Sequence, residues 1–268
     1  MIVTIDDALD PRLNAFRWRE RQLTTIAQRK SALNEGLFIA EGDLVVHRAL
    51  EAGCVPDVVL CDPKCATEFS DAVHTAGGTT LVASADIRRE VTGLGVPLDA
   101  IGVFKRPPLV SSDDLIAQSS RLIVLDCVDN PSNVGSIART AAALGWDGLL
   151  LDSTSSDPLS RRALRVSMGT TFKLGFARFA STNEILAQLH QSGFATIGLT
   201  PHHESRDVTN LRSIQIEGKR ALVLGSERQG LSDASLELCT QLANITMADG
   251  VDSLNVASAS AIACFALL

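Results

Sequence analysis

Residues 121–144 read RLIVLDCVDNPSNVGSIARTAAAL, and this stretch decides the fold. It opens with an apolar run ending at Asp126, which is typical of a strand buried on both faces of a sheet. Turn-forming residues around Pro131 follow, then a predicted helix over residues 134–144 that Gly145 closes. A buried strand followed by a helix that packs back on it indicates a parallel α/β sheet.

The same alternation continues through the rest of the chain. Strands are predicted at residues 148–151, 195–199, 221–224 and near Ile245. Helices are predicted at residues 160–168, 183–191, 232–239 and from Leu254 onward. We therefore predict an α/β fold whose mostly parallel sheet carries helices on both faces, with ligands at the carboxyl ends of its strands.

A smaller α/β/α layer domain is predicted upstream. Its strands are expected at residues 37–40, 57–60, 79–83 and 100–104, with helices at 43–52 and 67–76. Prolines, serines and aspartates then cluster between residues 105 and 114, which marks a boundary. The predicted organisation is a domain over residues 1–106, a linker over 107–118 and a second domain over 119–268.

Composition excludes several classes of protein. With 46% hydrophobic and 21% charged residues, the 268-residue chain has ample material for a core and is not disordered. No apolar run approaches the ~20 residues that cross a bilayer, and the N-terminus lacks a signal-peptide pattern. We therefore expect a cytoplasmic protein without a membrane partner. The six cysteines lack a metal-ligand spacing, so reduced thiols and no metal site are expected.

The charge is unevenly distributed. A net charge of −7 argues against indiscriminate nucleic-acid binding. Residues 11–30, however, hold six basic side chains and one acidic one, and residues 157–180 hold five and one. Residues 225–268 hold one basic and five acidic side chains. The two basic islands either bind a polyanion locally or are solvated helix faces, and the charges alone leave both open.

Two common cofactor motifs are absent. No G-x-G-x-x-G turn follows the strand that ends at Asp126, which excludes the dinucleotide-binding pattern. Gly225 and Gly230 have the spacing of a phosphate-binding loop, but Leu231 stands where that loop needs its lysine. The sequence therefore lacks the motif that would best indicate nucleotide hydrolysis.

Three stretches that each follow a strand hold the candidate site residues. The first runs from Asn133 to Arg139, the second from Leu224 through Glu227 to Leu231, and the third from Met247 to Asn255. At helical spacing, Asn133 and Arg139 lie on one side of their helix. Taken singly, an acid near a turn or a serine or asparagine at a helix start is an ordinary cap.

Together these stretches resemble the three ordered motifs of the SpoU/TrmH branch of the SPOUT RNA methyltransferases. The resemblance covers residues 121–268, and Phe38 to Gly42 with Ile101 to Arg106 is similar to the RNA substrate-binding domain of its ribosomal-RNA members. It implies a deep trefoil knot, a homodimer, S-adenosylmethionine as cofactor and methylation of ribose 2′-hydroxyls in RNA. Ser226, Arg228 and Thr246 depart from the usual residues of the family.

The resemblance also implies roles for individual residues. Arg139 corresponds to the catalytic arginine that helps to deprotonate the ribose hydroxyl, with Glu227 expected to hold its guanidinium. Asn133, Ser253 and Asn255 correspond to its other supporting residues. The expected cofactor-binding residues are Gly225, Ile245, Leu254, Leu224, Met247 and Thr200.

The resulting hypothesis is an RNA 2′-O-ribose methyltransferase that acts on ribosomal RNA. Two alternatives remain: a transfer-RNA methyltransferase of the same branch, and a non-catalytic RNA-binding dimer with the same fold. The additional N-terminal domain favours ribosomal RNA, and the complete set of polar site residues disfavours the inactive dimer.

Overall fold

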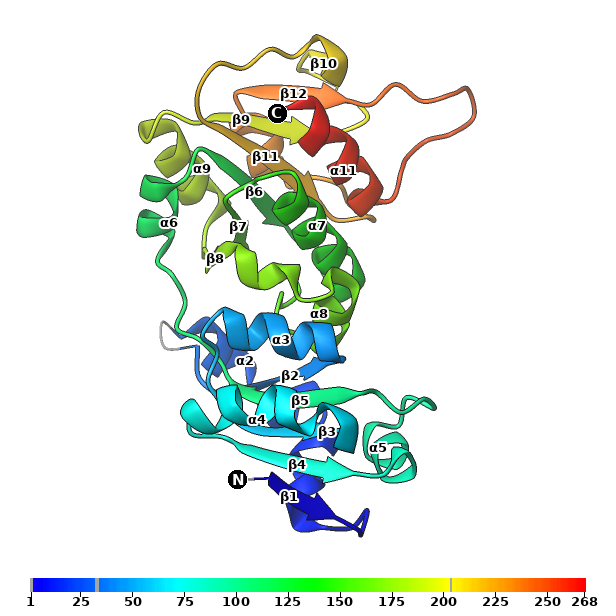
Figure 1. The fold of residues 1–268 in the computed structure, drawn as a ribbon. Helices are drawn as coiled ribbons and strands as arrows, with labels where there is room; N and C mark the ends of the chain where they lie inside the picture. The colour runs from blue at the N-terminus through cyan, green and yellow to red at the C-terminus, as the bar shows by residue number, and fades with distance from the viewer. Residues whose placement is uncertain (1, 32–33, 203) are drawn as a thin grey trace. The chain divides into compact units, whose positions relative to one another are not determined.

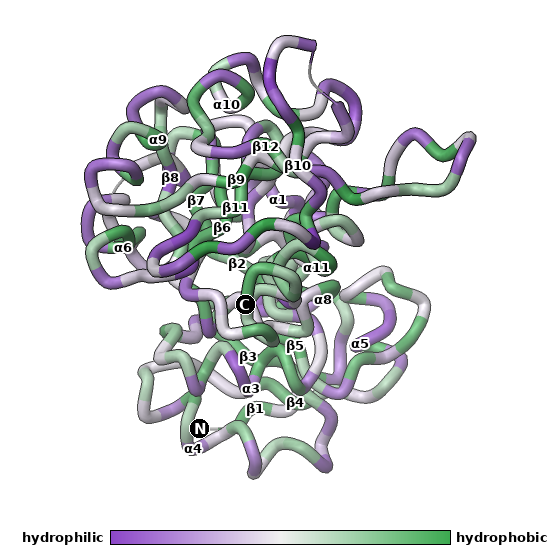
Figure 2. Tube along the Cα trace, turned by 90° about the horizontal axis from the view of Figure 1, so that it is seen from above, coloured by the Kyte–Doolittle hydropathy of each residue, from purple (hydrophilic) through white to green (hydrophobic). Residues whose placement is uncertain are grey.

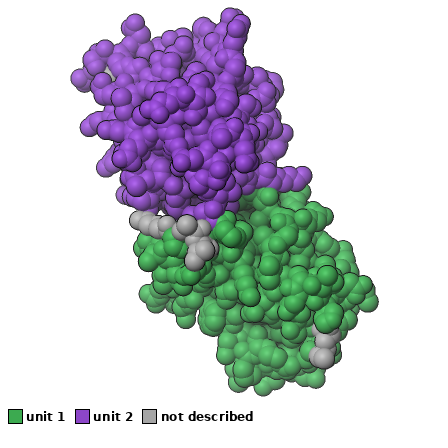
Figure 3. Space-filling model, turned by 90° about the vertical axis from the view of Figure 1, so that its left-hand side faces the viewer, with its two compact units in different colours: residues 1–108, 159–172 green, residues 109–158, 173–268 purple. Residues whose placement is uncertain are grey.

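The structure is a computed structural model that describes residues 2–31, 34–202 and 204–268. The chain forms two compact units, coloured separately in Figure 3. Unit 1 contains residues 1–108 and 159–172, and unit 2 contains residues 109–158 and 173–268. Each unit is built on one β-sheet (Figure 1).

Unit 1 contains a five-stranded sheet in the order β1-β4-β3-β5-β2. Its elements are β1 (Ile2–Ile5), η1 (Pro11–Arg17), α1 (Glu20–Leu23), α2 (Ile26–Lys30), β2 (Leu37–Glu41), α3 (Asp43–Glu51), β3 (Pro56–Cys61), η2 (Pro63–Cys65), α4 (Ala66–Thr75), β4 (Thr79–Ala83), α5 (Ala85–Thr92), β5 (Ala100–Lys105) and α8 (Arg161–Ser167), with η3 (Thr170–Lys173) at its boundary. Strand β5 runs antiparallel to both of its neighbours, β2 and β3. Leu13 and Phe16 of η1 and Val91 of α5 pack with one set of alternating strand residues, and α3 and α4 pack against strands of the same sheet.

Unit 2 contains a seven-stranded sheet in the order β10-β12-β9-β11-β6-β7-β8. Its elements are α6 (Ser112–Gln118), β6 (Arg121–Asp126), α7 (Pro131–Ala143), β7 (Gly148–Leu151), β8 (Gly175–Arg178), α9 (Thr182–Gln191), β9 (Ala195–Leu199), β10 (Val208–Asn210), η4 (Leu211–Ser213), β11 (Arg220–Gly225), α10 (Asp233–Leu238), β12 (Gln241–Asn244) and α11 (Val256–Ala266). Every pair of neighbouring strands is parallel. The predicted parallel α/β sheet is therefore confirmed.

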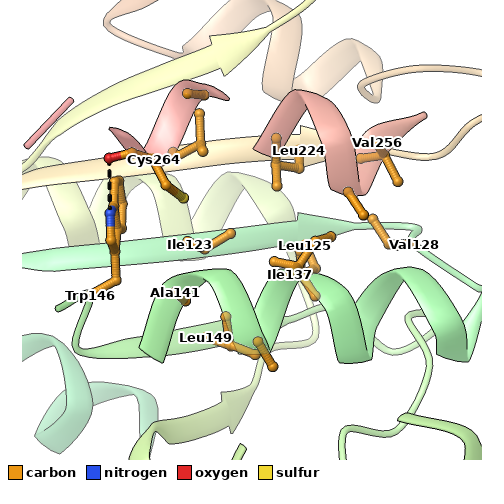
Figure 4. Packing of buried hydrophobic residues seen from close by; sticks show 14 of the residues in the cluster. Ile123, Leu125, Val128, Ile137, Ala141, Trp146, Leu149, Leu224, Val256 and Cys264 are labelled. Atoms are coloured by element: carbon orange, nitrogen blue, oxygen red, sulfur yellow. Dashed lines mark hydrogen bonds between the residues drawn. The ribbon is translucent and has the colours of Figure 1, made fainter. Parts of the chain in front are cut away.

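Apolar residues bury both faces of the unit 2 sheet. One layer combines Ile123 and Leu125 of β6 with α7 and α11, and the other combines Leu122 and Val124 with α6 and α9. Figure 4 shows the first layer, in which Trp146 donates from Nε1 to the carbonyl oxygen of Cys264 at 3.3 Å. Burial on both faces explains why the apolar run of β6 is continuous.

The predicted linker over residues 107–118 is wrong in its second half. Residues 112–118 form α6, which buries Leu115 and Ile116 in the core of unit 2. Ser111 caps this helix, because its Oγ accepts from the N–H of Asp114 at 3.0 Å. Serine and aspartate begin helices as readily as they form loops, so the turn chemistry was ambiguous.

The boundary of the predicted second domain also differs from the compact units, because residues 159–172 pack within unit 1. One of the contacts that hold this segment in unit 1 involves the buried carboxylate of Glu41, at the end of β2. Nη1 of Arg161 lies 3.3 Å from Oε1 of Glu41, and Nη1 of Arg165 lies 2.6 Å from Oε2. A buried carboxylate requires charged or hydrogen-bonding partners, and α8 provides them.

Candidate active site

A pocket of about 630 Å³ opens at the carboxyl ends of β9, β11 and β12, which are neighbours in the sheet. Three connections line it: residues 199–202 after β9, residues 224–231 at the end of β11, and residues 245–256 after β12. Apolar side chains including Leu199, Leu224 and Ile245 line part of it, and the polar residues Glu227, Ser253 and Asn255 line the rest. Its size and mixed lining are typical of a site for one small organic ligand.

The connection after β11 is a tight hairpin closed by its own backbone. The N–H of Ser226 donates to the carbonyl of Gly230 at 2.9 Å, and the N–H of Gly230 donates back to Ser226 at 3.0 Å. A Cβ atom on Gly225 would lie only 2.1 Å from the carbonyl carbon and oxygen of Gly230. Glycine is therefore required at position 225. The close approach of Gly225 and Gly230 within the hairpin explains why these two glycines have the spacing of a phosphate-binding loop.

Asp126 supports this hairpin from the neighbouring strand, a role that the sequence did not reveal. It ends β6, in register with Gly225 of β11, and is 2% exposed. Its Oδ2 accepts from the N–H of Ser232 at 2.9 Å and from Oγ of Ser235 at 2.6 Å. The acid thus fixes the residues that follow the hairpin, and its position at the end of a buried strand was the available signal.

A second buried carboxylate, Asp152, shapes the turn that leads from β6 to α7. Its Oδ1 accepts from the N–H groups of Cys127 at 3.1 Å and Ser155 at 2.8 Å, and Thr154 donates to Oδ2. Burial raises the pKa of Asp152, but hydrogen bonds from Ser155 and Thr154 outweigh it and lower the pKa below its ordinary value. The bond to Cys127 holds that residue in the left-handed region, at φ 62°.

Asn133 and Asn255 connect the first and third motifs. Nδ2 of Asn255 donates to Oδ1 of Asn133 at 3.2 Å, and Oδ1 of Asn255 caps α11 by accepting from Ala257 N–H at 2.9 Å. Asn133 is 6% exposed, and its Nδ2 has no hydrogen-bond partner among the described residues. A buried amide donor without a partner is costly, so Nδ2 of Asn133 retains an unused capacity for a hydrogen bond.

Arg139 lies elsewhere on α7. Its side chain is exposed and does not line the pocket. The described residues show no ion pair between Arg139 and Glu227, so Glu227 does not hold this guanidinium within the single chain. Asn133 and Arg139 also differ in exposure, because Asn133 is buried on the helix that they share.

The structure brings most of the expected site residues together. All six residues expected to bind the cofactor line the pocket: Gly225, Ile245, Leu254, Leu224, Met247 and Thr200. Glu227, Ser253 and Asn255 line it as well, whereas Asn133 reaches it through Asn255. Over the described part of the chain, no group of three or more His, Cys, Asp or Glu side chains is arranged to hold a metal ion.

Residues 120–265 match the SpoU rRNA Methylase family. The chain belongs to this family. An uncharacterized tRNA/rRNA methyltransferase of Mycobacterium bovis is 34% identical over 260 residues, which cover 97% of this chain and 89% of that protein. The relationship therefore extends across both units of this SpoU-family chain.

Solved structures share the fold. An S-adenosylmethionine-bound rRNA methyltransferase of Sinorhizobium meliloti has a TM-score of 0.83 at 24% identity, covering 99% of this chain and 97% of that one. An RNA 2′-O ribose methyltransferase has a TM-score of 0.74 at 24% identity, covering 99% and 97%. The SpoU family uses S-adenosylmethionine, so this protein is an RNA methyltransferase with that cofactor.

The pocket fits this cofactor. An apolar lining suits the adenine ring and the methionine methylenes, while the polar side chains of Glu227, Ser253 and Asn255 offer hydrogen bonds. The backbone at Gly225 leaves no room for a side chain.

Among the described helices, none has the length and hydrophobicity that crossing a membrane requires.

Proposed function

We propose that this protein methylates the ribose 2′-hydroxyl of a nucleotide in ribosomal RNA. The observation that carries the proposal is the gathering of all six expected cofactor residues, with Glu227, Ser253 and Asn255, around one pocket. The backbone at Gly225, Ile245 and Leu254, together with Leu224, Met247 and Thr200, would hold S-adenosylmethionine. The bound cofactor supplies a methyl group carried on a positively charged sulfonium.

The remaining site residues act on the acceptor. Transfer to a hydroxyl needs alignment of the oxygen and removal of its proton. Arg139 has planar donors that would orient a ribose and its phosphate, and help with removal of the hydroxyl proton would be its second role. Asn133 contributes its unpaired Nδ2 donor, positioned by the bond from Asn255.

Unit 1 would bind the RNA, which favours ribosomal RNA over transfer RNA as the substrate. In the first basic island, Arg12 pairs with Asp10 and Arg17 donates to the carbonyl of Ala8. Arg19 and Arg21 are exposed without an ion pair to a described residue. These two arginines are therefore the better candidates for phosphate contacts.

Three of the five basic residues of the second island are engaged within their own units. Arg161 and Arg165 pair with the buried Glu41 in unit 1. Arg178 donates to the carbonyl oxygens of Asp152 and Ser155 in unit 2. These arginines stabilise the fold, so we assign the RNA contact to the first island.

We further propose a homodimer that forms through α11. This helix contains no charged residue, and Figure 2 shows its hydrophobic character. Phe265 is 70% exposed and Ile262 is 43% exposed on it. Contiguous exposed apolar side chains mark an interface, and a second copy of the same helix is a self-complementary partner. Sedimentation at micromolar concentration tests this dimer, and a purely monomeric protein would contradict it.

The proposal includes a trefoil knot at the C-terminal end of unit 2 and a cytoplasmic location, where the RNA substrate would be found. Contacts from Asn255 to Asn133 and from Trp146 to Cys264 bind the last segment back against α7 and its following turn, as such threading requires.

The deciding experiment is a methylation assay with radiolabelled S-adenosylmethionine. The acceptors are ribosomal RNA and transfer RNA from a strain that lacks the gene, and 2′-O-methyl positions are mapped afterwards. The proposal predicts a 2′-O-methyl group in ribosomal RNA. Methylation of transfer RNA alone would establish the first alternative, and RNA binding without turnover would establish the non-catalytic dimer.

A further inference from the structure

Arg228 is the one arginine or lysine among the described residues that line the pocket. Its side chain is exposed, and it makes no hydrogen bond or ion pair with a described residue. Glu227 precedes it directly but does not pair with it. The charge of Arg228 is therefore available to a ligand at the rim of the pocket.

The backbone beneath Arg228 is held firmly. Ser226 and Gly230, on either side of the hairpin tip, exchange two backbone hydrogen bonds of 2.9 and 3.0 Å. The N–H of Gln229 also donates to Oγ of Ser226 at 3.1 Å. Asp126 fixes Ser232 just beyond the hairpin. Because the hairpin backbone is already ordered, the side chain of Arg228 can bind a ligand with little further loss of backbone entropy, which favours recognition.

The acidic residues of this region indicate why a cation is useful at the rim of the pocket. Glu227 lines the pocket, and the connection after β12, part of which also lines it, carries the exposed residues Asp249 and Asp252. An RNA strand carries one negative charge per phosphate and is repelled by these carboxylates. The planar fork of an arginine offsets that repulsion, because it matches the oxygens of a phosphate group.

We infer that Arg228 binds a backbone phosphate of the acceptor RNA next to the nucleotide that enters the pocket. This inference rests on the proposed function. The exposed position of Arg228 on the hairpin tip favours an acceptor phosphate over the carboxylate of the cofactor, which a pocket with an apolar lining would enclose more deeply. The carboxylate of S-adenosylmethionine is therefore the alternative ligand that the experiment must distinguish from an RNA phosphate.

The test compares Arg228→Gln with Arg212→Gln, which removes another exposed arginine, on η4 and outside the pocket lining. Affinity for unmodified ribosomal RNA is measured across a salt series, affinity for S-adenosylmethionine by calorimetry, and KM for RNA by methyl transfer. Arg228→Lys keeps the charge and serves as the rescue.

We expect Arg228→Gln to weaken RNA binding five- to tenfold and to reduce the slope of log affinity against log salt by about 0.7–0.9, the value for one lost phosphate contact. Its affinity for S-adenosylmethionine should stay within about twofold of the wild type. Arg228→Lys should recover much of the RNA affinity, and Arg212→Gln should change neither ligand's affinity.

Three outcomes overturn the inference. Weaker S-adenosylmethionine binding with unchanged RNA affinity would show that Arg228 binds the carboxylate of that cofactor. An unchanged salt slope, or an equal effect of Arg212→Gln, would make Arg228 ordinary surface charge. Because RNA affinity is measured without turnover, the result stands even if the wild type fails to methylate RNA, a failure that would refute the proposed function instead.

Discussion

Replacing Asp126 with alanine should weaken S-adenosylmethionine binding although the side chain does not line the pocket. The substitution leaves the Ser232 N–H without its acceptor and takes from Ser235 Oγ its shortest hydrogen bond. A buried donor that loses its partner costs about 1–3 kcal/mol, and Ser235 Oγ retains a longer contact to Ser232 Oγ at 3.3 Å. We therefore expect the free energy of unfolding to fall by roughly 2–4 kcal/mol.

Part of that loss should appear at the pocket, because Asp126 anchors the residues that follow the hairpin. If ordering the hairpin on ligand binding costs about 1.4 kcal/mol more in the variant, the dissociation constant for S-adenosylmethionine rises about tenfold. Isothermal titration calorimetry measures that constant, and thermal unfolding without ligand measures stability separately.

Asp147→Ala is the matched control. Asp147 Oδ2 also accepts two N–H groups beside β6, from Ser120 at 2.7 Å and Arg121 at 2.8 Å, but at the opposite end of the strand. This variant should lower the unfolding temperature while leaving the dissociation constant within about twofold. Equal effects of both variants on ligand binding, or normal binding by Asp126→Ala, would refute the proposed support of the hairpin.

Three further predictions follow from the site and the charges. Arg139→Ala should abolish methyl transfer while S-adenosylmethionine affinity stays unchanged, because Arg139 lies outside the pocket lining; near-normal turnover would show that the proposed site is wrong. Arg19→Ala with Arg21→Ala should weaken RNA binding and reduce the salt slope by up to about 0.7–0.9 per contact, whereas an unchanged slope would make them ordinary surface arginines. Asp152→Asn should destabilise the protein at neutral pH. Since the folded pKa of Asp152 is lowered, its contribution is present above the unfolded pKa of about 3.9 and disappears as pH falls through the folded value. The difference between wild type and variant in urea unfolding should therefore shrink in acid; a difference independent of pH would contradict this.

Local sequence predicted most of the strands and the loops that follow them, but it did not predict β1, β8 or β10. The apolar run of β6 is continuous because α-helices cover both faces of its sheet. Such a run can be recognised in a short segment of sequence without knowledge of the rest of the fold. The expected cofactor residues follow strands that are parallel, so their loops meet at one edge of the sheet. For this reason the edge of the sheet that holds the pocket could be predicted from the strand pattern, whereas the individual cofactor residues followed from the resemblance to the SpoU/TrmH motifs.

Tertiary structure decided the contacts between distant polar residues. Asp126 and Ser235 are 109 positions apart, and Arg165 and Glu41 are 124 apart. Periodicity reports which face of an element is apolar, but it does not say which distant partner a charged side chain will find. A basic island has the same sequence pattern whether its arginines contact solvent, RNA or a buried carboxylate. The tertiary contacts of residues 159–172, including those with Glu41, place this segment in unit 1.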